Sequence, residues 1–439
     1  MTWFAYNILF TMGYLLMLPY FIFRMARRGG YLKGFLQRLC IFSASDRAKI
    51  AKARRVWVHA VSVGEIQVAL QFMSKLREMD PATSFLLTTT TSTGHSVASK
   101  SLHPADCLAY FPVDFPLVVR RALRLFRPRA LVLVEGELWP NLVRACAGHG
   151  IPVFVVNGRM SAKSERGYGM LRTFFERAIN QVTLLCVQTP EDRERLIRLG
   201  ARPERVRVMG STKYDIAESD GQVAARVAAL LKSMGVTEGA PILVGGSTWP
   251  GEEAVMAEIL KKLRARHRDL RLVLVPRHAE RAAGIAAEIG RCGLSVGLRS
   301  MARKPGFVSG DVILVDSTGE LMGFYSMASV VFVGKSLTEH GGQNFIEPAA
   351  LGKPVVVGPN TENFPGVIRD FLAADAIVQV QDAAGLENAV GKLLDDPSLR
   401  IAYGTRAAEL VRSKRGAMHA TVELVLAEIQ RCPDAATSC

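Results

Sequence analysis

Two glutamates, Glu339 and Glu347, bracket a glycine-rich stretch whose residue types suit an anionic ligand. A glutamate carboxylate is a good bidentate acceptor for two neighbouring hydroxyl groups, such as those of a ribose. Between them lie Gly341 and Gly342, and we expect the free backbone N–H groups of this loop to suit a phosphate. Asn344 can cap the short helix predicted to follow. Together these residues predict a nucleotide-sugar site.

A glutamate at the start of another predicted helix could act as a general base. Glu65 follows the predicted strand Val56–His59 and a turn, so it lies in the first helical turn, where the helix dipole favours a carboxylate. Beside a sugar hydroxyl, Glu65 could take the proton during nucleophilic attack. The alternative is a structural role, in which Glu65 only stabilises the amino terminus of the helix.

Two further carboxylates, Glu135 and Glu137, directly follow the apolar strand predicted at Ala130–Val134. Carboxylates this close shift each other's pKa or serve different partners. One of them could instead cap the helix predicted to begin near Pro140. Lys213 follows a later predicted strand, where its ammonium group could meet a phosphate or a carboxylate as a point charge.

The second half of the chain places cationic and small residues after its predicted strands. Arg277 and His278 follow the strand predicted at Leu272–Val275, and the guanidinium of Arg277 is a candidate phosphate ligand. The segment 245–253 opens a helix and offers N–H groups and hydroxyls to an anion. The segment 316–322 follows another strand, so several strand ends are predicted to converge on one pocket.

Short apolar segments alternate with helical patterns from Val56 onward, which is typical of βαβ units and parallel sheets. Such sheets bind ligands at the carboxyl ends of their strands, where the residues above lie. Two sets of about six strands predict an α/β fold with two doubly wound, Rossmann-like domains facing a cleft. The predicted strands are Val56–His59, Phe85–Thr89, Ala130–Val134, Val153–Val156, Leu184–Val187, Val206–Met209, Ile242–Gly245, Leu272–Val275, Val312–Val315, Val330–Val333, Val355–Val357 and Ile377–Val380.

The length and composition also bound the domain organisation. A chain of 439 residues, of which 49% are hydrophobic, is long enough for two or three compact domains. The predicted segments are a membrane anchor at 1–23, a basic membrane-proximal segment at 24–55, an amino-terminal acceptor-side domain at 56–215, a connector at 216–235, a carboxy-terminal nucleotide-binding domain at 236–415, and a helix and tail at 416–439.

The amino-terminal segment is predicted to attach the chain to a membrane. Residues 2–23 contain no charged side chain and would span about 33 Å as a helix, enough to cross a bilayer core of about 30 Å. Arginines follow this segment, so the positive-inside rule predicts a single-pass anchor with the remaining chain in the cytoplasm. Shallow insertion along the membrane surface, favoured by Asn7 and Pro19, is the alternative.

An excess of basic residues indicates an anionic partner. The net charge is +15, and residues 24–55 hold ten Lys or Arg against one acid, Asp46. Each basic residue near an anionic membrane surface contributes on the order of 1 kcal/mol to the binding free energy. An anionic membrane surface is therefore the predicted partner. Nucleic acid is not expected, because no RNP, zinc-finger or recognition-helix pattern accompanies the charge. A second basic run at 120–129 is either a solvated helix face or a contact for the phosphates of an anionic acceptor.

Six motifs stand out together: H-A-V-S-V-G-E, E-x-E-L-W-P-N, K-Y-D, G-G-S-T-W-P-G-E-E, V-P-R-H-x-E-R and E-H-G-G-Q-N-x-I-E-P-A-A-L-G-K-P-V. In combination they resemble the 3-deoxy-D-manno-octulosonic acid (Kdo) transferases of Gram-negative bacteria, over nearly the whole chain. The resemblance implies a GT-B glycosyltransferase fold and transfer of Kdo from CMP-Kdo to lipid IVA, a lipid A precursor, in lipopolysaccharide biosynthesis. It also implies a location at the inner membrane, and no cofactor.

The resemblance further assigns roles to individual residues. Glu65 matches the catalytic base of the family, while Glu135 and Lys213 match positions implicated in the transition state. Gly136 stands where the family usually has Thr, so the assignment to Glu135 rather than Glu137 stays open. The positions matching the CMP site are Pro276, Arg277, Gly319, Glu320, Leu321, Asn344, Phe345, Ile346 and Glu347.

These observations predict an inverting transfer that needs no metal. The cytidine ribose is expected on Glu347, the phosphate near Arg277 and the Gly341–Gly342 loop, and the acceptor hydroxyl beside Glu65. Arg and Lys side chains can neutralise the single phosphate of CMP, and the sequence lacks the Asp-x-Asp dyad of metal-dependent transfer. The alternatives are another membrane-associated GT-B transferase that uses a UDP-sugar on a lipid acceptor, or a nucleotide-sugar-binding protein without turnover.

Overall fold

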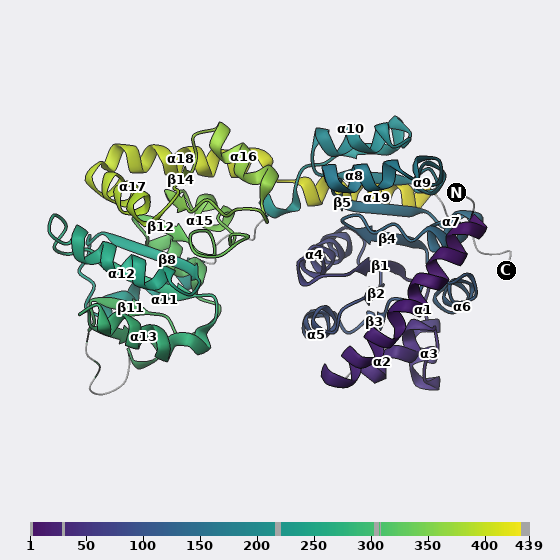
Figure 1. Cartoon of the computed structure of the whole chain (residues 1–439), viewed down its shortest axis with the longest axis horizontal. Helices are drawn as coiled ribbons and strands as arrows, with labels where there is room; N and C mark the ends of the chain where they lie inside the picture. Colours follow the sequence, from purple (N-terminus) through teal and green to yellow (C-terminus); the bar gives the residue numbers. More distant parts are fainter. Residues whose placement is uncertain (1–2, 29–30, 216–220, 303–306, 308, 432–439) are drawn as a thin grey trace. The chain divides into compact units, whose positions relative to one another are not determined.

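The computed structural model describes residues 3–28, 31–215, 221–302, 307 and 309–431, and the chain divides into two compact units. Unit 1 comprises Met1–Asp215 with Gly416–Cys439, and unit 2 comprises Ile216–Arg415. Each unit holds one parallel sheet with helices on both faces (Figure 1). This is the layered arrangement expected where apolar strands alternate with amphipathic helices.

The sheet of unit 1 contains β1 (Val56–Ala60), β2 (Phe85–Thr89), β3 (Cys107–Tyr110), β4 (Ala130–Val134), β5 (Val153–Gly158), β6 (Leu184–Val187) and β7 (Val206–Val208). Its order is β3-β2-β1-β4-β5-β6-β7, and all neighbours are parallel. Val56 of β1 lies opposite Phe85 of β2 and Ala130 of β4. The strand order reverses at β1 and β4, which is where doubly wound sheets bind ligands.

Helices cover both faces of this sheet. Alternate residues of β1 serve the two faces, because Trp57 packs in one core cluster and Val58 in the other. The helices of unit 1 are α1 (Trp3–Arg28), α2 (Tyr31–Arg38), α3 (Ala44–Ala51), α4 (Val63–Met79), α5 (Ser92–Ser101), α6 (Pro116–Phe126), α7 (Pro140–Gly148), α8 (Ala162–Gly169), α9 (Arg172–Ile179), α10 (Pro190–Arg198) and α19 (Ala417–Arg431), with 3₁₀ turns η1 (Pro203–Arg205) and η2 (Thr212–Tyr214).

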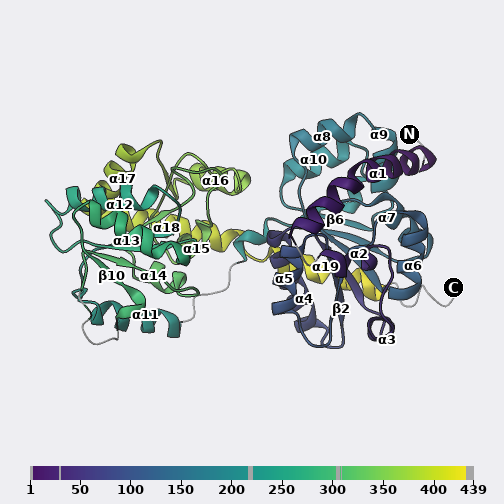
Figure 2. The same cartoon turned by 60° about the horizontal axis from the view of Figure 1, so that its bottom comes forward.

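The last helix, α19, belongs to unit 1 although it follows unit 2 in the chain (Figure 2). Val422 of α19 and Phe72 of α4 are fully buried in the same core cluster. The carboxylate of Asp215 accepts hydrogen bonds from the backbone N–H groups of Gly416 (2.6 Å) and Met418 (2.7 Å). These contacts join the segment at which the chain leaves unit 1, at Asp215, to the segment at which it returns, at Gly416.

The sheet of unit 2 contains β8 (Ile242–Thr248), β9 (Arg271–Pro276), β10 (Val296–Leu298), β11 (Val312–Leu314), β12 (Val330–Val333), β13 (Val355–Val357) and β14 (Val378–Gln379). Its order is β10-β11-β9-β8-β12-β13-β14, again parallel throughout. Leu243 of β8 lies opposite Leu272 of β9 and Val330 of β12, so β8 is the central strand.

The helices of unit 2 are α11 (Gly221–Ser233), α12 (Glu252–Leu263), α13 (Ala282–Arg291), α14 (Leu321–Met327), α15 (Ile346–Ala350), α16 (Pro365–Ala373), α17 (Ala383–Asp395) and α18 (Pro397–Lys414), with 3₁₀ turns η3 (Ala279–Arg281) and η4 (Arg299–Met301). Helix α11 lies in the segment predicted as a connector and packs against α14. The contact is close, because a Cβ on Gly323 would lie 2.6 Å from the side chain of Val227.

The prediction of parallel α/β sheets is confirmed, and all twelve predicted strands are present. The structure adds two strands that the sequence did not indicate, β3 and β10. Each of them lies at one edge of its sheet. The sites expected at strand ends keep their positions, because the added strands displace none of the central ones.

Helix α1 packs along unit 1. The rings of Tyr6 and Phe174 stack with their centres 5.3 Å apart, and Tyr14 meets Phe115 edge-on at 5.1 Å. The hydroxyl of Tyr6 also donates a hydrogen bond of 2.9 Å to the buried carboxylate of Asp114. Across the described ranges, no helix is both long and apolar enough to span a membrane. The single-pass anchor stays a prediction.

Candidate functional site

Glu65 lies where the chain leaves β1 and enters α4. The Ser62 hydroxyl accepts a hydrogen bond from the Glu65 N–H (3.2 Å), and the Glu65 carboxylate accepts from the N–H groups of Val61 (2.9 Å) and Ser62 (3.2 Å). This reciprocal capping box is the structural role that the sequence left open. Each carboxylate oxygen has a second lone pair, so the oriented, half-buried carboxylate can still accept a proton.

Glu135 is the first residue after β4 and adopts a left-handed conformation with φ of 68°. Its N–H donates to the carbonyl oxygen of Val156 (2.9 Å), and its own carbonyl accepts from the N–H of Arg159 (3.0 Å). A non-glycine residue in this region costs on the order of 1–3 kcal/mol, and such strain concentrates at functional sites. The two bonds to the end of β5 hold Glu135 in this conformation.

Lys213 lies in η2, beyond the end of β7. The side-chain oxygen of Asn157, which follows the apolar part of β5, accepts a hydrogen bond of 3.3 Å from the N–H of Thr212. Asn157 itself adopts a left-handed φ of 54°. The turn that carries Lys213 is thereby tied to the same strand end that holds Glu135.

The charged groups at this edge of the sheet influence each other's ionisation. Burial raises the pKa of Glu135 and the charge of Glu65 raises it further, whereas Lys213 and Arg159 lower it. Burial lowers the pKa of Lys213, as does Arg159, whereas Glu135 raises it. Loss of hydration and the charge of Glu65 raise the pKa of Glu137. The structure therefore brings together Glu65, Glu135 and Lys213, and adds Arg159, which the sequence analysis missed.

In unit 2, Glu347 lies in the first turn of α15. The side-chain amide of Asn344 donates to the Glu347 carboxylate (3.0 Å), and the Asn344 oxygen accepts from the N–H of Ile346 (3.2 Å). Burial raises the pKa of Glu347, while Asn344 and the charge of Arg277 lower it. Phe345 and Ile346 are fully buried, so we expect only their backbone atoms to face a ligand.

Glu320 directly precedes α14 and forms an ion pair. Its carboxylate accepts two 2.6 Å hydrogen bonds from Arg299 and one of 2.6 Å from the Ser317 hydroxyl. Arg299 is accordingly the main cause of a lowered pKa of Glu320. Of the neighbouring predicted positions, Gly319 adopts a left-handed φ of 88°, Leu321 begins α14 and Pro276 ends β9. A ligand at Glu320 meets a carboxylate that is already paired.

The glycine-rich loop after β12 does not offer the free N–H groups that the sequence predicted. The N–H of Gly341 donates to the Glu362 carboxylate (2.7 Å), and that of Gly342 donates to the carbonyl oxygen of Lys335 (2.8 Å). The N–H of Gln343 is also bonded, to the carbonyl of Gly334 (3.1 Å). The prediction that these N–H groups are free is wrong, because acceptors within the protein already bond them.

The Gly-, Ser- and Thr-rich segment after β8 also carries its own anion. The fully buried Glu252 accepts hydrogen bonds from the N–H groups of Trp249 (2.8 Å), Lys335 (2.9 Å), Ser336 (3.1 Å) and Leu337 (3.1 Å). Burial raises the pKa of Glu252, and these four bonds act in the opposite direction. Of the N–H groups predicted for an anion in segment 245–253, that of Trp249 is therefore already bonded to a side chain of the protein.

Cationic side chains lie at the same edge of the sheet. The ammonium group of Lys335 lies 4.5 Å from the ring centre of Trp249, which meets the His278 ring at 5.6 Å. Arg277 is exposed, and its N–H donates to the carbonyl of Thr248 (3.1 Å). Lys335 was not predicted, although it follows a buried strand as Arg277 does. In the part of the chain that is described, no cluster of three or more His, Cys, Asp or Glu residues could hold a metal ion.

Both units match known protein families. A family model described as 3-deoxy-D-manno-octulosonic-acid transferase (kdotransferase) matches residues 33–216, and one described as glycosyl transferases group 1 matches residues 308–410. The 3-deoxy-D-manno-octulosonic acid transferase of Bordetella pertussis is 35% identical over 411 residues, which cover 92% of this chain and 94% of the relative. The chain belongs to the Kdo transferase family. It is accordingly a glycosyltransferase that transfers Kdo.

Further comparisons agree with this family. The 3-deoxy-D-manno-octulosonic acid transferase of Haemophilus influenzae is 31% identical over 377 residues, covering 86% of this chain and 87% of the relative. A solved glycosyltransferase structure from Rickettsia africae ESF-5 aligns with a TM-score of 0.55 at 10% identity, over 88% of this chain and 99% of that one. The latter likeness shows the fold alone, a GT-B-like pair of α/β domains. Membership in the Kdo transferase family decides against the UDP-sugar transferase and against a binding protein without turnover.

Proposed function

We propose that this Kdo transferase takes Kdo from CMP-Kdo and attaches it to a hydroxyl of lipid IVA, with inversion at the anomeric carbon and without a metal. The observation that carries the proposal is the cluster of Glu65, Glu135 and Lys213 at the carboxyl edge of the unit 1 sheet. A carboxylate and a lysine with shifted pKa values beside a second carboxylate, at the edge where parallel sheets bind ligands, are typical of a catalytic site.

Glu65 is the proposed general base. Two backbone N–H groups orient its carboxylate at the end of β1. Removal of the proton from an attacking hydroxyl by such a group contributes typically about 10²–10⁴-fold to the rate. The acceptor oxygen attacks the anomeric carbon from the face opposite CMP, which inverts the configuration.

Glu135 and Lys213 are proposed to stabilise the transition state. Lys213 and Arg159 favour the ionised form of Glu135 in spite of its burial. A negative Glu135 can in turn stabilise positive charge that develops on the sugar as the bond to CMP breaks. Because Kdo is an acid, Lys213 and Arg159 also offer cationic partners for its carboxylate.

Unit 2 is proposed to bind CMP-Kdo. Arg277 and Lys335 supply positive charge for the single phosphate, in place of the glycine-loop N–H groups that are internally bonded. Glu347, held by Asn344, supplies a carboxylate for the ribose hydroxyls. Glu252, whose carboxylate is bonded to four backbone N–H groups, is proposed to have a structural role and no contact with the donor.

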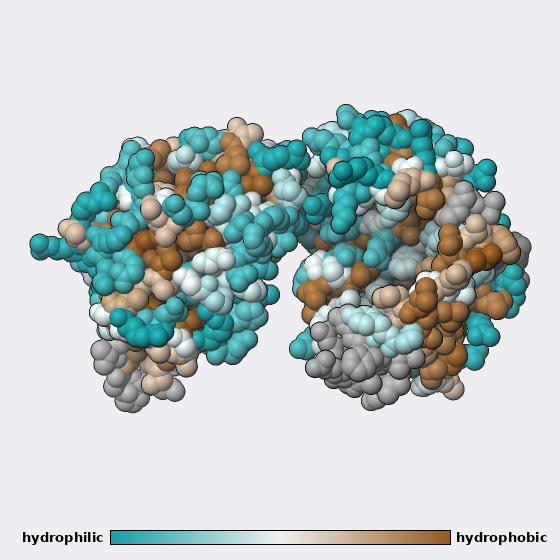
Figure 3. Space-filling model, viewed as in Figure 1, coloured by the Kyte–Doolittle hydropathy of each residue, from teal (hydrophilic) through white to brown (hydrophobic). Residues whose placement is uncertain are grey.

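The enzyme is proposed to work at the cytoplasmic face of the inner membrane. Apolar side chains gather along α1 on the surface of unit 1 (Figure 3), and α6 exposes Arg120, Arg121 and Arg124 to solvent. Because α1 also packs on unit 1, its contacts favour shallow insertion along the surface over a single pass. Among the α1 residues whose exposure is described, the exposed large hydrophobic ones are Phe4, Ile8, Leu9, Met12, Leu15, Leu16, Met17 and Tyr20.

Two measurements on the purified full chain test the donor and the acceptor. CMP is expected to raise the melting temperature more than UDP at equal concentration, because a ligand stabilises the folded state according to its affinity. Mass spectrometry of lipid IVA after incubation with CMP-Kdo is expected to show Kdo-modified product. A larger stabilisation by UDP, or no modified lipid, would contradict the proposal.

A further inference from the structure

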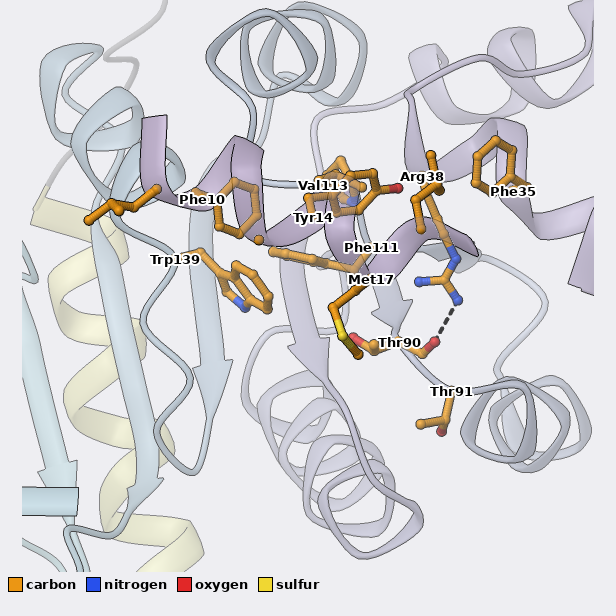
Figure 4. Close-up of a pocket in the computed structure, with 14 residues that line it drawn as sticks. Phe10, Tyr14, Met17, Phe35, Arg38, Thr90, Thr91, Phe111, Val113 and Trp139 are labelled. Atoms are coloured by element: carbon orange, nitrogen blue, oxygen red, sulfur yellow. Dashed lines mark hydrogen bonds between the residues drawn. The ribbon is translucent and has the colours of Figure 1, made fainter. Parts of the chain in front are cut away.

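A largely apolar pocket lies beneath α1 in unit 1 (Figure 4). Its volume of about 670 Å³ falls within the range of about 300–1,000 Å³ typical of small-molecule sites. Helices α1 and α2 and the segments that follow β2 and β3 supply its walls. The hydrophobic part of the lining includes Phe10, Met17, Phe35, Phe111 and Val113.

A few polar groups interrupt this lining. The guanidinium of Arg38 reaches down from α2 and donates to the carbonyl oxygen of Thr90, as the dashed line in Figure 4 marks. The hydroxyl of Thr90 and the indole N–H of Trp139 are buried and have no hydrogen-bond partner among the described residues. Because surrounding side chains close both atoms off, a molecule in the pocket would meet the guanidinium of Arg38 rather than these two atoms.

The pocket adjoins the candidate catalytic carboxylate. The hydroxyl of Thr91, a lining residue, donates to the carbonyl of Val61 (3.0 Å), and the N–H of Val61 donates to the Glu65 carboxylate (2.9 Å). On another wall, Trp139 lies two residues after Glu137. A molecule seated in the pocket therefore has one part close to the edge of the sheet at which transfer is proposed to occur.

We propose that this pocket binds one fatty acyl chain of the acceptor, an inference that rests on the proposed function. The apolar lining suits a hydrocarbon chain, and Arg38 suits an anionic group near the head of that chain.

The position of α1 explains how such a chain would enter. Helix α1 lines the pocket with Phe10 and Met17, and it also exposes apolar residues such as Leu16 to solvent. An acyl chain can therefore pass from a lipid layer along this helix without crossing a polar surface. One chain held in this way positions the acceptor hydroxyl relative to Glu65 and selects acylated over soluble sugars.

Fluorescence quenching tests the pocket independently of turnover. The probe is a saturated fatty acid brominated along its chain, used below its micelle concentration with the full-length protein. Bromine close to Trp139 is expected to quench its emission in a saturable manner, and the variant Trp139→Phe is expected to lose most of that signal. Trp249, which lies in unit 2 and does not line the pocket, reports non-specific binding.

A pair of substitutions on α1 provides the matched comparison. Gly13 lines the pocket, and a Cβ there meets no atom within 4 Å, so Gly13→Phe can fill the space without a clash. Leu16 is 78% exposed, so Leu16→Phe adds the same ring on the outside of the helix. We expect the probe to bind roughly ten-fold more weakly to Gly13→Phe and equally well to Leu16→Phe.

Kinetics then connect the pocket to the acceptor. Gly13→Phe is expected to raise the KM for the acylated acceptor roughly ten-fold more than the KM for its chemically de-acylated form. Equal quenching in Gly13→Phe and the parent protein, or equal losses in Gly13→Phe and Leu16→Phe, would overturn the proposal. Saturable quenching of Trp139 without any transfer of Kdo would instead overturn the proposed function and leave a hydrocarbon site.

Discussion

At the scale of single residues, Glu135 and Lys213 form a pair in which each charge shifts the pKa of the other. Glu135 combines burial, a nearby like charge from Glu65 and a left-handed backbone, and Lys213 opposes the rise in its pKa. A carboxylate kept ionised in this way makes activity sensitive to pH. The effect of Lys213 on the pKa of Glu135 can therefore be tested by the pH dependence of the rate as well as by the rate itself.

The variant Lys213→Met is expected to lower kcat and to move the acidic limb of the pH–rate profile to higher pH. Removal of the cation raises the pKa of Glu135, and a carboxylate needed in its ionised form then protonates at higher pH. The profile of kcat/KM from pH 4 to 9 measures this. An acidic limb that stays in place, or that moves to lower pH, would show that Lys213 does not act on Glu135.

Arg277 is the residue most directly exposed to the proposed phosphate. Arg277→Ala is expected to raise the KM for CMP-Kdo roughly ten- to hundred-fold, because a charge-assisted contact to the donor is lost, with a smaller effect on kcat. Arg268→Ala removes a similarly exposed arginine of unit 2 and serves as the control. A donor KM equal to that of the control would remove Arg277 from the donor site.

The sequence placed several of these residues correctly and misjudged others for a physical reason. Polar residues after buried strands were a sound guide to Glu135 and Arg277, and the same rule applied to Arg159 and Lys335 would have found them. The glycine-loop N–H groups were predicted free because only the folded loop brings their acceptors, the Glu362 carboxylate and the carbonyl of Lys335, next to Gly341 and Gly342. Which acceptors such N–H groups meet depends on the tertiary fold.

At the scale of elements, the start of α12 holds the loop that follows β12. Glu252 gathers four backbone N–H groups from two segments, so Glu252→Ala leaves several buried donors without a partner. The free energy of unfolding is expected to fall by about 3 kcal/mol or more. Urea unfolding measures this, with the exposed Glu258→Ala of the same helix as the control. Equal stability of the two variants would contradict the structural role of Glu252.

The attachment of α1 to unit 1 depends on a buried carboxylate. Burial raises the pKa of Asp114 to about 7, although Tyr6 and the N–H groups of Asn141 and Leu142 donate to it. A raised folded-state pKa stabilises the fold below the unfolded value, and this contribution is lost as the pH rises through about 7.

The free energy of unfolding is therefore expected to decline by up to about 1 kcal/mol per pH unit between about pH 4 and 7. Asp114→Asn removes this titration. The difference in the free energy of unfolding between the parent protein and the variant should therefore change with pH. Unfolding in urea at several pH values measures it. A difference that does not change with pH would show that Asp114 titrates normally.

The two strands that the sequence did not reveal, β3 and β10, are short strands at the edges of their sheets. The edge strand β10 has three residues, of which the middle one is Gly297, so it lacks an apolar run. The edge strand β3 has four residues and is formed largely by pairing with β2. Central strands such as β4 and β12 were predictable because both of their faces are buried and their sequences are continuously apolar.

At the scale of the whole molecule, the motifs were sufficient for the family and the repeated strands for the fold class. The return of α19 to unit 1 was not predictable, since it depends on packing against α4 and on hydrogen bonds to Asp215. The pocket beneath α1 was equally hidden, because segments from five parts of unit 1 form it. Local patterns identify elements, and only the fold shows which of them share a surface.

The central claim is that Glu65 is the base for transfer of Kdo from CMP-Kdo, and Glu65→Gln tests it most directly. Glutamine keeps the capping box at the start of α4 but is not a proton acceptor at neutral pH. We expect transfer to lipid IVA to fall at least about 100-fold while CMP still raises the melting temperature as in the parent protein. The exposed Glu78→Gln of the same helix is expected to retain activity. Undiminished transfer by Glu65→Gln would contradict the account.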